Sequence, residues 1–270
     1  MTGIEPAAPR IDTSKPHPAR VYDWFLGGKD NYPVDEELGR HIMSIDARAK
    51  HVAQTNRWFM QRVTRWLAGE AGLRQYLDVG TGIPTEPNLH QIAQAAAPES
   101  RIVYTDNDPI VLTHAEALLR SSPEGVTDYI QADVRDPDRI LGQARKILDF
   151  EQPIALSLVA LLHFVGDEDE PYALVRRLVD ALPSGSYLVV SQLTADFDPL
   201  AVQRGVDMYA AGGVTLAPRA YAEMERFFEG LELTAPGIVQ LTQWHPELRV
   251  GEVSDGDEAV SLYAGVARKP

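Results

Sequence analysis

The stretch "YLDVGTGIPTEPNLHQIA", residues 76–93, determines how the rest of the chain is interpreted. An apolar run ends at Asp78, and glycines follow at positions 80 and 82 before a helical pattern begins. A strand that turns sharply into a helix needs residues without a Cβ where its backbone comes close to a ligand. The stretch therefore predicts a strand, a ligand-binding turn formed by Gly80, Thr81 and Gly82, and a helix.

The pattern that begins here continues along the chain. Apolar runs typical of buried strands occur at 75–80, 101–108, 128–134, 154–162 and 186–193, with helical patterns at 86–97, 109–120, 137–148 and 170–182. This alternation predicts an α/β fold: a doubly wound, seven-stranded, mostly parallel sheet with helices on both faces. The last two strand candidates, 237–244 and 259–269, have no helix between them. We therefore expect the last strand to be antiparallel.

The composition changes along the chain and predicts three parts. Residues 1–20 are rich in proline and are expected to form a disordered leader. Residues 21–72 combine aromatic side chains with helical spacing and predict an N-terminal helical lid or cap. Residues 73–270 form the expected ligand-binding α/β domain, with an insertion on the substrate side at about 199–216.

Charge and composition exclude some classes of function. Lys and Arg total 25 and Asp and Glu total 39, so the net charge is −14, which repels nucleic acid and anionic lipid. The chain has no cysteine, which excludes disulfides and cysteine chemistry and fits the cytoplasm. No apolar run is long enough to span a membrane. A homodimer is expected only because dimers are the commonest assemblies.

Three carboxylates stand at the ends of predicted strands, namely Asp78, Asp106 and Asp133. Their convergence on one crevice disfavours a diphosphate and suits a ligand that carries a sulfonium and an ammonium group. Charge matching thus favours S-adenosylmethionine over NAD. Thr85, at the third position of the dinucleotide fingerprint, and Glu86, in the first turn of the helix, point in the same direction.

Several motifs together resemble those of class I S-adenosylmethionine-dependent methyltransferases, which have a Rossmann-like fold. They are "YLDVGTGIP" (76–84), "VYTDND" (103–108), "IQADVRD" (130–136) and "LSLVALLHFV" (156–165). More narrowly, "ARVYDWFLGGKDNYPVD" (19–35) and "LVALLHFV" (158–165) resemble a bacterial S-adenosyl methyltransferase-like family of largely unassigned substrate. This narrower resemblance runs from Arg20 to the end of the chain.

The resemblance implies how the cofactor would be held. The glycine turn would run along its methionine part, and Asp106 would hold the ribose. The remaining residues expected at the cofactor are Asp78 and Thr81 at the turn, Asn107 beside Asp106, Asp133 and Val134 at the adenine, and the backbone of Val159 and Ala160 as the floor of the site.

Two further features have a functional and a structural interpretation. His163 is expected to end the fourth strand, either as a general base for the reaction or as a histidine held by backbone groups. The aromatic segment 21–32 is either a lid over cofactor or substrate or an N-terminal docking segment. The lid residues would be Tyr22, Lys29, Asn31 and Tyr32.

The function expected from these features is in-line transfer of a methyl group to a small-molecule acceptor. No metal site is expected, since the acidic run 167–170 lacks ligand spacing. Two alternatives remain open at this point. One is a regulatory protein that binds the cofactor without turnover, and the other is an NAD-dependent dehydrogenase.

Overall fold

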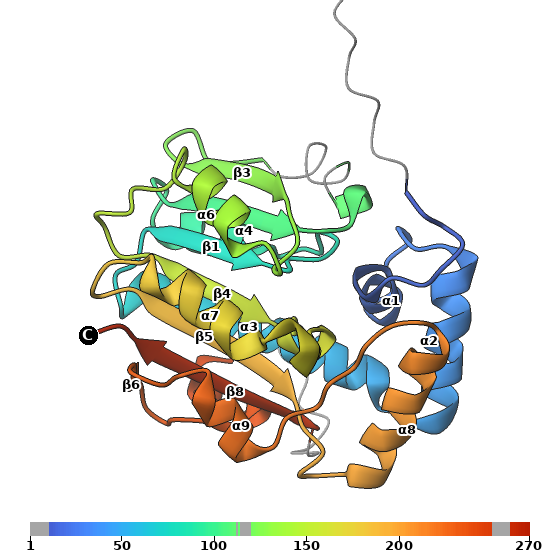
Figure 1. Cartoon of the computed structure of the whole chain (residues 1–270). Helices are drawn as coiled ribbons and strands as arrows, with labels where there is room; N and C mark the ends of the chain where they lie inside the picture. Colours follow the sequence, from blue (N-terminus) through green and yellow to red (C-terminus); the bar gives the residue numbers. More distant parts are fainter. Residues whose placement is uncertain (1–10, 112, 114–119, 250–259) are drawn as a thin grey trace, which may run out of the picture.

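The sheet forms the centre of the molecule in the computed structural model, which describes residues 11–111, 113, 120–249 and 260–270 (Figure 1). Its strand order is β3-β2-β1-β4-β5-β8-β6, with β7 paired to β8. The strands are β1 (Gln75–Val79), β2 (Arg101–Asp106), β3 (Val126–Gln131), β4 (Ala155–Val159), β5 (Tyr187–Leu193), β6 (Glu232–Leu233), β7 (Val239–Gln240) and β8 (Leu262–Arg268).

The first five strands are parallel, and β8 runs antiparallel to β5. The fold class predicted from the sequence is confirmed. One detail differs, because the stretch 237–244 forms only the two-residue strand β7 and a 3-10 helix, while a second short strand, β6, pairs with β8 near its C-terminal end. The described chain thus has two short strands where one long strand was expected.

Helices cover both faces of the sheet and enclose two cores. On one face, α3 (Ala49–Gly69) and α4 (Leu89–Ala96) pack on side chains such as Tyr76 and Ile102. On the other face, α6 (Pro137–Ala144), α7 (Pro171–Asp180) and α9 (Tyr221–Arg226) enclose the neighbouring residues Leu77 and Val103. Adjacent residues of each strand therefore bury apolar surface on opposite sides, as expected for a strand covered on both faces.

A third group of helices lies beyond the C-terminal ends of the parallel strands (Figure 1). It consists of α1 (Pro18–Phe25), α2 (Pro33–Ile45) and α8 (Pro199–Ala211), and we call it the cap. Its own apolar cluster is small, with Val21, Leu38 and Ile42 buried. Short 3-10 helices complete the described chain: η1 (Leu162–Phe164), η2 (Asp167–Asp169), η3 (Leu241–Gln243) and η4 (Pro246–Leu248).

Two of the expected boundaries are wrong, and one expected helix lies largely outside the described residues. The fourth strand ends at Val159, so His163 lies in η1 and not in the strand. The leader was expected to extend to residue 20, but α1 begins at Pro18. The helix expected at 109–120 has only residues 109–111, 113 and 120 among the described ones. None of the described helices is long and apolar enough to cross a membrane.

The strand order also determines where a ligand can bind. The chain winds outward from β1 to β2 and β3 in one direction, and from β4 to β5 in the other. In an open parallel sheet, the loops after the two central strands diverge at this point and leave a crevice at their C-terminal ends. β1 and β4 are therefore the strands whose ends should form the binding site.

Candidate functional site

A crevice of about 380 Å³ lies at the C-terminal ends of β1, β2 and β4. All ten residues expected at a cofactor line this one crevice. They are Asp78, Gly80, Thr81, Gly82, Asp106, Asn107, Asp133, Val134, Val159 and Ala160. Strand pairing explains this convergence. Asp78 of β1 lies opposite Ser157 of the neighbouring strand β4, and the neighbour of β1 on the other side is β2, which ends at Asp106.

The turn after β1 depends on two glycines in the left-handed region. Gly80 has φ +76° and Gly82 has φ +68°, values that disfavour residues with a Cβ. The N–H of Gly82 donates to Oδ2 of Asp106 at 2.8 Å and so ties the turn to the end of β2. A Cβ on Gly80 would meet the side chain of Leu161 at 2.6 Å, whereas one on Gly82 would meet nothing within 4 Å. The two positions thus differ: neighbouring protein crowds Gly80, and Gly82 faces open space.

Two carboxyl groups in the crevice are buried. Asp78 and Asp106 are 8% and 6% exposed, and burial raises the pKa of each above its ordinary value. Hydrogen bonds from Ser157 and Thr81 and the charge of Arg57 partly offset the effect at Asp78. At Asp106, hydrogen bonds from the backbone N–H groups of Gly82 and Asp108 partly offset the effect of burial on the pKa. A ligand that brings positive charge and hydroxyl groups would stabilise both carboxylates.

Asp133 has a different environment at the outer end of the crevice. It accepts hydrogen bonds from the side chain of Asn107 at 2.9 Å and from the backbone of Arg135 at 2.9 Å. Burial opposes ionisation, but these bonds and the Arg135 charge hold the pKa of Asp133 below its ordinary value. Neighbouring protein groups therefore hold the Asp133 carboxylate ionised and fixed at this end of the crevice.

Arg57 of α3 lines the crevice and was not expected from the sequence. Its Nη2 donates to the carbonyl oxygens of Thr85 and Pro87 and to Oδ1 of Asn88, which holds the loop after the glycine turn. Its Nε is buried and has no hydrogen-bond partner among the described residues. A lone arginine in a helix about twenty residues before β1 carries no sequence signal of this role.

The N-terminal segment 16–19 also lines the crevice, although it was assigned to the leader. His17 and Arg20 approach Oδ2 of Asp108 at 3.2 and 3.1 Å, and the His17 N–H donates to Asp35 at 2.9 Å. Arg20 and Asp108 are both 3% exposed. We call residues 16–22 the strap, because residues 16–19 and Tyr22 line the crevice and the segment is anchored at Asp108. Residues 213–215, after α8, line the crevice as well.

Only one of the four expected lid residues lies at the crevice. Tyr22 lines it, while Lys29 is exposed and lies outside it. Asn31 donates to Asp23 and to the Gly28 carbonyl, and the Tyr32 ring packs against Arg20. The glycine turn 27–28 and its polar neighbours therefore stabilise the junction of α1 and α2, and Tyr22 is the residue of this group that can contact a ligand.

Glu86 lies on the exposed side of its loop and does not line the crevice. The Glu86 charge therefore gives no support for a cationic ligand over a diphosphate. The preference for a cationic ligand depends on the buried Asp78 and Asp106 alone.

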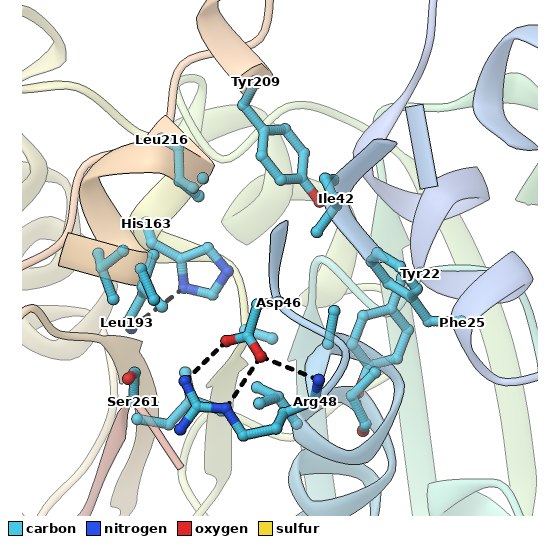
Figure 2. Close-up of a pocket in the computed structure, with 18 of the residues that line it drawn as sticks. Tyr22, Phe25, Ile42, Asp46, Arg48, His163, Leu193, Tyr209, Leu216 and Ser261 are labelled. Atoms are coloured by element: carbon cyan, nitrogen blue, oxygen red, sulfur yellow. Dashed lines mark hydrogen bonds and ion pairs between the residues drawn. The ribbon is translucent and has the colours of Figure 1, made fainter. Parts of the chain in front are cut away.

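His163 faces a second cavity that adjoins the crevice (Figure 2). After β4 the chain turns at Ala160, whose φ of +54° is unusual for a residue with a side chain. This turn leads into η1 and brings His163 against β5, where its Nδ1 accepts the Leu193 N–H at 3.4 Å. Burial lowers the pKa of His163 to about 3, and the charge of Arg219 acts in the same direction. A neutral imidazole whose Nδ1 already accepts a hydrogen bond is poorly suited to act as a general base.

The sheet order, the glycine turn and the acidic strand ends together define the class of S-adenosylmethionine-dependent methyltransferases. Comparison with known proteins gives the family, because residues 4–270 match the S-adenosyl methyltransferase family and the chain belongs to it. It is thus a methyltransferase that uses S-adenosylmethionine. No curated protein is significantly similar to the chain.

Solved structures agree with this assignment. The chain is 51% identical to a DUF574 family protein from Streptomyces avermitilis, with 97% of this chain and 100% of that chain covered and a TM-score of 0.92. It is 40% identical to a protein of Thermobifida fusca assigned as a methyltransferase, with 96% of both chains covered and a TM-score of 0.85. An S-adenosylmethionine-dependent methyltransferase from Anabaena variabilis shares the fold at 13% identity, with 99% and 100% covered and a TM-score of 0.53.

Proposed function

We propose that the protein transfers the methyl group of S-adenosylmethionine to a small-molecule acceptor by in-line displacement. The observation that carries the proposal is the pair of buried carboxyls, Asp78 and Asp106, in a crevice that a second cavity adjoins. When bound, the cofactor supplies a methyl group on a positively charged sulfur. The protein then has to orient the acceptor and exclude water, and positioning of this kind provides much of the rate.

The roles of individual residues follow from their positions in the crevice. Asp106 accepts hydrogen bonds from the ribose hydroxyls, because each of its oxygens keeps acceptor capacity beyond its backbone bond. Asp78 lies near the cationic methionine part, and the Arg57 guanidinium provides positive charge for the carboxylate of the same part. Asp133 and Val134 flank the adenine at the outer end.

The cap and the N-terminal strap enclose this site. Tyr22 and Asn56 line both the crevice and the second cavity. A continuous set of hydrogen bonds holds this boundary. The Ala160 N–H donates to Ser191, the Ser191 hydroxyl donates to Asn56, and Asn56 donates to the Tyr22 hydroxyl. The methyl group would pass between the two spaces beside this boundary.

The acceptor, the location and the assembly are part of the same proposal. The net charge of −14 supports a free small molecule over nucleic acid as the partner, and the absence of cysteine is consistent with the cytoplasm. A homodimer is the assembly we propose, since it is the commonest one. Sedimentation equilibrium would test it, and a single species of monomer mass would rule it out.

Ligand binding tests the proposal directly. S-adenosylhomocysteine at 100 times its Kd should stabilise the protein by about 2.7 kcal/mol in a thermal unfolding assay, and NAD at the same concentration should not. Asp106→Asn should weaken S-adenosylhomocysteine binding by about 1–3 kcal/mol in calorimetry, because the ribose hydroxyls lose a charged acceptor.

The matched control is Asp128→Asn, which changes an exposed aspartate on β3. Stabilisation by NAD and not by S-adenosylhomocysteine would refute the proposal. Equal affinities of the Asp106 and Asp128 variants would remove Asp106 from the cofactor site.

A further inference from the structure

The second cavity has a volume of about 170 Å³ and lies between α1, α2, α3 and α8. Its walls are mainly apolar and include Phe25, Ile42 and Val202 (Figure 2). An engineered cavity of about 150 Å³ in another protein is known to hold benzene. The volume here is therefore of the size of one aromatic ring with a few further atoms.

The cavity opens toward the proposed position of the methyl group. Pro18, Tyr22, Asn56, Ala160 and Phe164 line both the cavity and the cofactor crevice. The cavity and the crevice are therefore adjacent and share these residues as a common boundary. This arrangement is the one that a methyl acceptor requires, because its reacting atom must meet the methyl group while water is excluded.

One polar group of the cavity has a defined direction and proton state. Because Nδ1 of His163 accepts the Leu193 N–H, the ring proton of the neutral imidazole resides on Nε2. Nε2 has no hydrogen-bond partner among the described residues, and Figure 2 shows it on the side of the ring away from Leu193, in the cavity that Tyr209 and Ile42 also line. His163 thus offers a hydrogen-bond donor to whatever occupies the cavity.

The charged groups of the cavity are already paired. Arg48 contacts Asp46 at 2.9 Å and Asp198 at 2.8 Å, so two carboxylates surround one guanidinium. Among the described residues that line the cavity, Arg48 is the one lysine or arginine. An anionic acceptor would therefore lose its hydration without gaining a free positive partner, which makes its binding unfavourable.

We infer that the acceptor is a molecule without negative charge, about one aromatic ring in size, seated in the second cavity, with an oxygen or nitrogen atom that accepts a hydrogen bond from Nε2 of His163. This inference rests on the proposed function. It assigns His163 the role of a specificity-determining donor, where the sequence left open a general base or a histidine held by backbone groups. The apolar walls provide most of the binding energy, and the His163 N–H fixes the orientation of the ring.

Simple aromatic probes test each part of the inference. The protein loaded with S-adenosylhomocysteine is titrated with p-cresol, toluene and 4-hydroxybenzoate, which share the ring and differ in the polar group. We expect p-cresol to bind at least threefold more tightly than toluene, the scale of one neutral hydrogen bond, and 4-hydroxybenzoate to bind more weakly than p-cresol. His163→Phe should lower p-cresol affinity to that of toluene and leave toluene affinity unchanged.

A blocking variant locates the probe. Gly205 of α8 lines the cavity, and a Cβ there would meet no atom within 4 Å, so Gly205→Phe should fold and fill the space. The matched control is Gly142→Phe on α6, where a Cβ also meets nothing within 4 Å. We expect p-cresol binding to be lost in the Gly205 variant and retained in the Gly142 variant, with S-adenosylhomocysteine affinity unchanged in both.

The outcomes separate this inference from the proposed function. Absent S-adenosylhomocysteine binding in the unaltered protein would refute the proposed function, and with it the premise of the inference. With normal S-adenosylhomocysteine binding, the inference is overturned if p-cresol fails to bind, if 4-hydroxybenzoate binds more tightly, or if Gly205→Phe binds p-cresol normally. An equal loss of p-cresol and toluene affinity in His163→Phe would overturn the assignment of the donor.

Discussion

His163 shows how a single backbone turn changes the role of a side chain. If β4 had continued to residue 162, His163 would have stood at the strand end beside the cofactor crevice. The left-handed conformation of Ala160 instead turns the chain into η1, and the imidazole packs against β5. His163 is 7% exposed, so its charged form is strongly disfavoured. The residue therefore acts, in our proposal, through a fixed N–H and not through proton transfer.

The depressed pKa of His163 predicts how stability depends on pH. The folded-state pKa of about 3 lies below the ordinary value, so between these values the unfolded chain binds a proton that the folded chain does not. Stability due to this residue is complete above about pH 6.5 and falls as the pH is lowered. Between about pH 6.5 and pH 5 the protein should lose about 2 kcal/mol more than the His163→Gln variant.

Urea unfolding of both proteins at several pH values measures this difference, and titration of the carboxyl groups, which both proteins share, cancels in the comparison. Parallel pH profiles for the two proteins would show that His163 titrates normally in the folded state. That result would also remove the physical basis for its neutral form in the cavity.

At the scale of elements, the position of α1 depends on a few buried polar contacts. The helix is only eight residues long, and the cap cluster that it joins is small. The strap, which includes the start of α1, is held because its residues His17 and Arg20 contact Asp108. Asp108 lies two residues after the carboxylate proposed to bind the ribose. Anchoring of α1 and completion of the cofactor crevice are therefore linked through the segment 106–108.

Removal of the Asp108 charge should release the strap. Asp108→Asn leaves the buried Arg20 with a weaker partner, since Asp35 is 3.7 Å away. We expect a loss of about 3 kcal/mol in the free energy of unfolding, the low end for a broken buried pair, together with weaker S-adenosylhomocysteine binding. Glu99→Gln, which breaks the exposed pair with Arg74, should cost less than about 1 kcal/mol. Equal effects of the two substitutions would contradict the anchoring role of Asp108.

At the scale of the whole molecule, burial is unevenly distributed. The two cores on either side of the sheet contain most of the buried apolar side chains, whereas the cap has a small cluster of its own. Segments with few buried apolar contacts open locally at low free-energy cost. The cap therefore combines the walls of the proposed acceptor cavity with the lower local stability that entry of a ligand requires.

Hydrogen exchange tests this distribution. Without ligand, backbone amides of α1, α2 and α8 should exchange faster than those of β1, β2 and β4. S-adenosylhomocysteine should slow exchange in α1 more than in α2, because His17, Pro18 and Tyr22 line the crevice while no residue of α2 does. Protection of the cap equal to that of the central strands in the free protein would contradict this view.

The sequence by itself predicted the parallel sheet and ten of the residues that line the crevice. These features are local: an apolar run, a glycine pair and an acidic strand end each occupy a few consecutive residues, and parallel strands bring their ends to one edge. The parallel sheet and the crevice residues Asp78, Gly80 and Asp106 were therefore predictable without coordinates. Only the tertiary structure decided the roles of Arg57, the strap and His163. Each of these depends on contacts between segments far apart in the chain, and on the turn at Ala160, for which no local pattern exists.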